Sequence, residues 1–171
     1  CQSIKHVVYV EDARFSKGGE AGLADPKTMS IFLKGSYFSM PTTFFHEAAH
    51  LYDHKQKINF GIPDDQSEWA AISGASCYYK GGRMNEFIQD FNKTKTANAI
   101  LAPQGGQCAF EDLAIWVGAV YDSYLNNKPL PELFDATGSQ YSEKSKKKID
   151  FLLRKGFVSK EMFDKVIATP K

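Results

Sequence analysis

The segment PTTFFHEAAHLYDH, residues 41–54, joins a helical pattern of apolar side chains to three histidines. Its apolar residues recur at helical spacing and comprise Phe44, Phe45, Ala48, Ala49, Leu51 and Tyr52. Pro41 suits a first helical turn, and Gly61-Ile62-Pro63 interrupts the pattern. The sequence therefore predicts a helix that starts near Pro41 and ends before Gly61.

Within this helix, residues 46–50 read His46-Glu47-Ala48-Ala49-His50, an H-E-x-x-H pattern. Residues four apart stand on the same helix face, so both imidazoles can reach one metal ion. Glu47 lies beside them, where it can take a proton from a metal-activated water that attacks a carbonyl. Zinc, the usual metal in such sites, takes three protein ligands and leaves a fourth position for water. The competing interpretation is a pair of surface histidines without a metal.

The third ligand is expected to be a carboxylate. His54 repeats the four-residue step, but eight residues separate it from His46, which is about 12 Å along a helix axis. Glu68 on the next helix and Glu111 on a later one both leave enough chain to fold back. We favour Glu111, because small residues follow it on its helix, whereas bulky Trp69 adjoins Glu68. Asp112 is a further candidate.

Two acidic residues are predicted to support the ligands from behind. Asp53 follows His46 by seven residues and His50 by three, so it shares their helix face and can accept a hydrogen bond from a ligand imidazole. A solvent-facing carboxylate is the alternative for Asp53. Asp112, next to Glu111, is assigned to the same supporting role.

The remaining pattern predicts an α+β fold, mainly helical, with a small N-terminal sheet. Strands are expected at residues 4–10 and 29–33, with a glycine-rich turn after the first. Helices are expected from a cap at Asp64, Asp65 or Ser67 to Gly74, then at residues 84–91, 110–121, around 149–153 and 159–167. A chain of 171 residues fits one domain, residues 1–171, either complete or part of a longer protein.

Composition excludes several classes of partner. The net charge is +1, so no overall field favours nucleic acid or an anionic membrane. We interpret the local group Lys144, Lys146, Lys147 and Lys148 as a solvated helix start. No apolar run approaches the roughly 18 residues that a transmembrane helix needs. The expected partner is a peptide or protein substrate.

The cysteines leave two questions open. Cys1-Gln2-Ser3 is compatible with the lipid-carrying start of a mature bacterial lipoprotein, or with a boundary cut from a longer chain. Cys77 and Cys108 can form a disulfide in an oxidising compartment or remain buried thiols. We expect a secreted, periplasmic or cell-surface location.

The chain resembles bacterial zinc metallopeptidases of the gluzincin kind and, more remotely, the catalytic domain of anthrax lethal factor. The resemblance covers about residues 25–125 and is carried by residues 44–53, Trp69 with Tyr79-Lys80-Gly81-Gly82, and Glu111-Asp112-Leu113-Ala114. It implies a zincin-like fold in which Glu111, opening the later helix, completes the zinc site. It also implies an edge strand that pairs with an extended substrate, for which residues 29–33 are the candidate, with a plain core strand as the alternative.

One feature departs from the family pattern. Such proteins often carry a tyrosine shortly before the third ligand, where its hydroxyl stabilises the oxyanion of the tetrahedral intermediate. Residues 102–108 contain none, so we assign this role to Tyr79, with Tyr78 or a glutamine as alternatives. Tyr79 is otherwise a packed aromatic residue.

The sequence thus predicts zinc-dependent peptide-bond hydrolysis with Glu47 as the general base. One rival is a zincin-like binding module with weak or no activity, which the missing tyrosine favours. Another is a metal-dependent amide hydrolase with a cysteine ligand. Cys77 and Cys108 both follow the H-E-x-x-H pattern, which is the wrong order for peptide deformylase.

Overall fold

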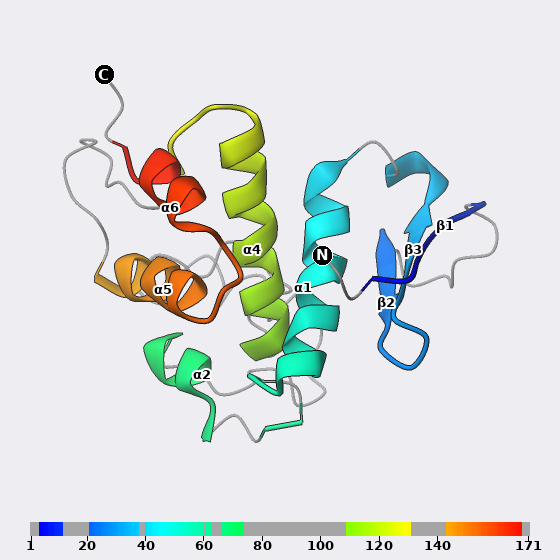
Figure 1. The fold of residues 1–171 in the computed structure, drawn as a ribbon, viewed down its shortest axis with the longest axis horizontal. Coiled ribbons are helices and arrows are strands. Elements are labelled where there is room, and N and C mark those ends of the chain that lie inside the picture. Colours follow the sequence, from blue (N-terminus) through cyan, green and yellow to red (C-terminus); the bar gives the residue numbers. More distant parts are fainter. Residues whose placement is uncertain are drawn as a thin grey trace, which may run out of the picture.

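The computed structural model describes residues 4–11, 21–37, 40–59, 61–62, 66–73, 109–130 and 143–168. In these residues the chain forms three strands, β1 (His6–Val10), β2 (Gly22–Asp25) and β3 (Ser30–Lys34), and the short 3-10 helix η2 (Gly35–Tyr37). Its α-helices are α1 (Pro41–Gln56), α2 (Glu68–Ser73), α4 (Ala109–Leu125), α5 (Glu143–Arg154) and α6 (Lys160–Val166). The fold is α+β with helices predominating, as predicted (Figure 1).

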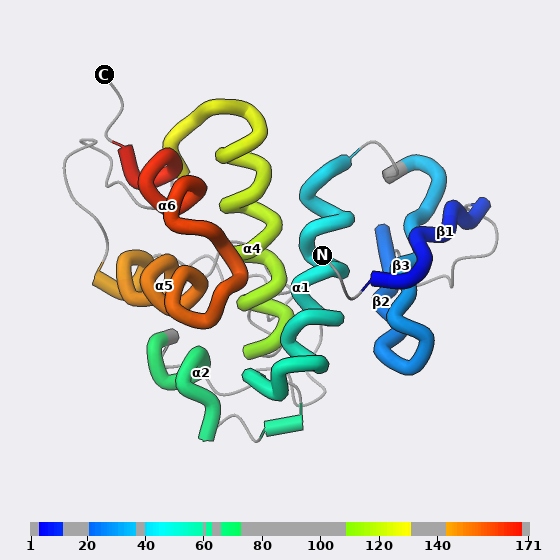
Figure 2. Tube along the Cα trace, in the orientation of Figure 1, coloured from blue at the N-terminus to red at the C-terminus, as the bar shows by residue number. Residues whose placement is uncertain are grey.

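The three strands form one small sheet in the order β1-β3-β2. β1 runs parallel to β3, and β2 runs antiparallel to it. The sheet lies on one side of α1, and the other α-helices lie on the opposite side (Figures 1 and 2). Ile31 and Leu33 of β3 pack with Leu51 of α1 in a small buried core between sheet and helix. The sheet is therefore anchored to the helix that carries the H-E-x-x-H pattern.

Two expectations about the sheet are wrong. Residues 29–33 do form most of a strand, but β3 is central, with β1 and β2 paired on its two sides, so it is no edge strand. The glycine-rich stretch expected to be a turn contains the start of β2 at Gly22. Gly22 belongs in a strand because its missing side chain lets β2 approach Glu47 of α1 closely.

Helix α1 begins at Pro41 and ends before Gly61, as the sequence predicts. Pro41 occupies its first position, where the absent N–H of proline loses no helical hydrogen bond. The helix stops at Gln56, because Lys57 adopts a left-handed conformation with φ of 53° and donates its N–H to the Asp53 carbonyl oxygen. The carboxylate of Asp53 accepts the N–H of Asn59 at 2.6 Å.

The main core lies among α4, α5, α6 and α2. On α4, the predicted apolar face is buried at Leu113, Ala114, Val117 and Val120. Ser67 caps α2 by accepting the N–H of Ala70, as one of the predicted caps, and α6 follows a similar cap at Ser159. Within the part of the chain that is described, no helix has the length and apolar character needed to cross a lipid bilayer.

One lysine of α5 differs from its neighbours. Lys146 and Lys147 are exposed, as expected of a solvated helix start, but Lys148 is fully buried. The expectation is wrong at Lys148 because its ammonium group forms an ion pair with buried Asp112 on α4. The predicted helix at residues 84–91 lies outside the described residues.

Candidate metal centre

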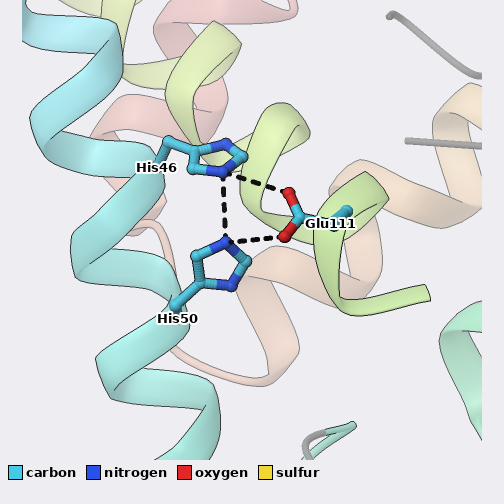
Figure 3. A group of neighbouring side chains, drawn as sticks. All are labelled: His46, His50 and Glu111. Carbon is cyan, nitrogen blue, oxygen red and sulfur yellow. Dashed lines mark hydrogen bonds and ion pairs between the residues drawn. The ribbon is translucent and has the colours of Figure 1, made fainter. Parts of the chain in front are cut away.

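Two histidines project from the middle of α1 toward the same point. His46 and His50 are one helical turn apart, and their Nε2 atoms lie 3.1 Å from each other. The rings meet edge to face with centroids 4.7 Å apart. Figure 3 shows both imidazoles facing the Glu111 carboxylate, which comes from α4. Two imidazole nitrogens this close together need either a shared proton or a cation between them.

Close packing of α4 on α1 delivers Glu111 to the histidines. Gly118 of α4 approaches α1 so closely that an added Cβ would lie 3.1 Å from the carbonyl oxygen of Thr42. One helical turn away along α1, the rings of Phe45 and Tyr121 stack with centroids 3.9 Å apart. Figure 1 shows that α4 runs antiparallel to α1, and the contact of His50 with Phe110 puts the first turn of α4 beside the histidines. The sequence favours Glu111 as a ligand because small residues follow it on this helix, and Gly118 is one of them.

The three side chains form what we call the ligand cluster: His46, His50 and Glu111. Glu111 Oε2 lies 3.3 Å from His46 Nε2, and Oε1 lies 3.5 Å from His50 Nε2. Two ligands of a tetrahedral zinc, each bonded at 2.0–2.1 Å, lie about 3.3 Å apart. One donor atom from each of the three residues lies within 4.8 Å of the others. The donor set and its spacing therefore fit a zinc ion.

The electrostatic environment of the ligand cluster favours the charged forms of Glu111 and His50. Burial raises the pKa of Glu111, but hydrogen bonds and positive charge from His46 and His50 outweigh it and hold the pKa at about 2. Burial lowers the pKa of His50, yet the Glu111 carboxylate outweighs that effect and raises it overall. The side chains remain 15–24% exposed, so a small ligand can reach them.

Glu47 lies on α1 next to these residues and against the sheet. Its side chain is buried, and this burial raises its pKa in spite of the opposing charges of His46 and His50. A Cβ added to Gly22 would lie only 2.8 Å from Glu47 Cγ and 2.9 Å from its Oε1. Strand β2 thus packs closely against the side chain of Glu47.

The side of β2 that does not pair with β3 faces this carboxylate. Lys34 donates its N–H to the Ala21 carbonyl, so the Ala21–Lys34 pair is a hydrogen-bonded one. Because such pairs alternate in antiparallel sheets, Gly22 and Ala24 direct their N–H and C=O groups away from β3. The Ala24 N–H also acts on Glu47, where it partly offsets the rise in pKa. Among the described strands, β2 ends the sheet on this side.

The other predicted site residues lie in different surroundings. Glu68, the alternative ligand, forms surface ion pairs with Arg154 at the end of α5 and with Lys155 directly after it. Asp53 is buried and accepts the Asn59 N–H, and its charge contributes to the raised pKa of His50. Asp112 is buried and accepts hydrogen bonds from Trp69 and Lys148.

Several predictions fall on residues that are not described. These are the roles of Tyr78, Tyr79, Cys77 and Cys108 and the proposed lipid anchor at Cys1. Sequence reasoning also missed residues at the site, namely Gly22 and Ala24. The closely spaced glycines before β2 are a signal of close backbone approach that could have pointed to them.

Comparisons with known proteins found no relative of this chain. No protein-family model matches the chain, and neither the curated proteins nor the solved structures include a match. Any functional conclusion therefore depends on the residues and their geometry.

Proposed function

We propose that this protein is a zinc-dependent peptidase with a zincin-like catalytic centre. The observation that carries the proposal is the ligand cluster, in which two imidazole nitrogens of one helix and the two carboxylate oxygens of Glu111 on another lie at spacings of 3.1–3.5 Å. His46, His50 and Glu111 would hold the ion. Zinc bound there would supply a Lewis acid for the scissile carbonyl and for the attacking water.

Glu47 is the general base in this proposal. Its raised pKa makes it a stronger base than an ordinary carboxylate, while leaving it able to lose the proton again. A carboxylate oxygen of Glu47 takes a proton from the attacking water and returns it to the nitrogen of the departing amine. Its position on α1, one residue after His46, keeps it beside the ligand cluster throughout.

Strand β2 is the surface on which we propose that an extended peptide binds. The outward N–H of Gly22 and the outward C=O groups of Gly22 and Ala24 can pair with a peptide main chain, which is recognition by strand addition. A peptide bound along this edge would pass next to Glu47, because β2 contacts that side chain. This assignment replaces residues 29–33 as the substrate-binding strand.

The test measures zinc content and peptide hydrolysis in the same preparations. We expect about one zinc per chain and cleavage of a fluorogenic peptide library by the parent protein. Glu47→Gln should keep its zinc and lose about 10²- to 10⁴-fold in hydrolysis, because the general base is gone. Glu143→Gln, an exposed glutamate of α5, is the matched control and should behave as the parent does.

Other outcomes distinguish the rival functions. Bound zinc without hydrolysis in either protein would support a binding module. Zinc that survives Glu111→Ala but is lost with Cys108→Ser would indicate a cysteine-ligated amide hydrolase. A parent that binds no zinc when zinc is offered would overturn the peptidase proposal.

A further inference from the structure

Lys148 of α5 is a buried charge that the proposed chemistry does not use. Its side chain is fully buried, and its ammonium nitrogen lies 5.2 Å from the centroid of Trp69 and 5.5 Å from that of Trp116. Burial lowers its pKa, and the charge of Asp112 opposes that change. A buried ion pair is a weak way to gain stability, since apolar residues often serve as well. Its presence therefore invites a more specific explanation.

The partner of Lys148 adjoins a residue of the ligand cluster. Lys148 Nζ donates to Asp112 Oδ2 at 2.5 Å, and Trp69 Nε1 donates to the same oxygen at 2.7 Å. We call Trp69, Asp112 and Lys148 the buried cluster. It joins α2, α4 and α5 at one carboxylate oxygen, and Asp112 directly follows Glu111 in the chain.

Glu111 and Asp112 lie at the start of α4, where a contact with other helices can fix the orientation of the helix. Both lie in the first turn of α4, and the first turn of a helix has fewer helical hydrogen bonds than its middle. Successive residues of a helix point about 100° apart, so fixing Asp112 toward α2 and α5 also fixes the direction of Glu111.

We propose that Lys148 is a positioning residue for the metal centre. Through Asp112 it holds the first turn of α4 in the rotation that aims the Glu111 carboxylate at His46 and His50. The inference rests on the proposed function, since the role it assigns to Lys148 is in metal binding. Lys148 itself lies on α5 and contacts none of the reacting atoms.

The experiment compares zinc affinities of folded proteins. Lys148→Met keeps an unbranched side chain and removes the ammonium group. Zinc affinity is measured by competition with a chromogenic chelator, well below each melting temperature, and cobalt(II) absorption reports the coordination geometry. We expect Lys148→Met to lose about 10- to 100-fold in zinc affinity, the range for residues that support ligands, and to show an altered cobalt spectrum. Lys147→Met, at the neighbouring exposed position, should match the parent.

A second variant guards against failure of the first to fold. Trp69→Phe keeps an aromatic ring and removes only the N–H that Asp112 accepts, so it should weaken zinc binding in the same direction. Parent-like zinc affinity in folded Lys148→Met or Trp69→Phe, even with a lower melting temperature, would overturn the inference and leave a stabilising role. A parent that binds no zinc at all would overturn the proposed function as well, so the two failures can be told apart.

Discussion

Two clusters of polar side chains meet at the first turn of α4 and differ in the source of their positive charge. The buried cluster contains a permanent cation, Lys148, enclosed with Asp112. In the ligand cluster, positive charge near Glu111 depends on a protonated histidine or on a bound ion. Glu111 and Asp112 are adjacent and carry the same charge, but Asp112 is buried with the ammonium group of Lys148, whereas Glu111 and the two histidines are partly exposed. The difference identifies Glu111 as the residue suited to an external cation.

The largest effect is expected from breaking the charge match of the buried cluster. Lys148→Met should lower the free energy of unfolding of the metal-free protein by about 3–5 kcal/mol, because it leaves a buried carboxylate without its cation. Urea unfolding measures this change. The double variant Asp112→Asn/Lys148→Met should recover most of the loss, since no uncompensated charge remains. If the free energy of unfolding of Lys148→Met falls by less than about 1 kcal/mol, as for a surface ion pair, the buried cluster does not depend on its cation.

In the ligand cluster, a substitution should change zinc affinity strongly and the stability of the metal-free protein only slightly. Glu111→Gln should weaken zinc binding by more than about 100-fold, because loss of a ligand exceeds the usual effect of losing a supporting residue. Its effect on metal-free stability should stay near 1 kcal/mol or less, since the pair is partly exposed. Titration with zinc and urea unfolding of the same protein provide both values. Unchanged zinc affinity would remove Glu111 from the site.

The helical half of the comparison could be predicted from sequence because its signals are local. The apolar spacing of residues 41–54 and 110–121 sets both helices, and helix geometry alone puts His46 and His50 on one face. Favouring Glu111 over Glu68 needed an argument about close packing. The structure supplies the reason in Gly118, which lets α4 approach α1.

What sequence could not give depends on contacts between distant segments. β2 has four residues after a glycine-rich stretch, too short a pattern to register as a strand. The central place of β3 depends on which strands pair with it, which no local pattern encodes. Lys148 lies among exposed lysines, and its burial follows from Asp112, 36 residues away. The buried cluster is therefore visible only once the helices are packed.

A change of pH should have a smaller effect, and this effect is expected in the ligand cluster. The raised pKa of His50 means that its proton stabilises the metal-free protein below about pH 6.5, and this contribution is lost as pH rises through the folded pKa. Glu111, with its pKa at about 2, stays ionised from pH 6 to 8. Zinc must displace the histidine proton. For each proton released, the affinity for zinc should fall about tenfold when the pH is lowered by one unit.

Thermal melts at pH 6 and pH 8, with and without zinc, measure this effect. Zinc should raise the melting temperature more at pH 8 than at pH 6. In Glu111→Gln the metal-free protein should lose much of its own pH dependence in this window, because the carboxylate that raises the pKa of His50 is gone. Equal zinc stabilisation at both pH values would argue against histidine ligands.

The smallest effect is expected at Glu68, which tests whether any surface carboxylate behaves like Glu111. Glu68 is half exposed and pairs with Arg154 and Lys155, which lower its pKa despite the opposing effect of partial burial. Such surface pairs contribute about 1 kcal/mol or less, so Glu68→Gln should change urea unfolding only slightly and leave zinc affinity unchanged. Weaker zinc binding in this variant would mean that α2 supplies the third ligand. The contrast between Glu111 and Asp112 would then no longer explain how the metal is held.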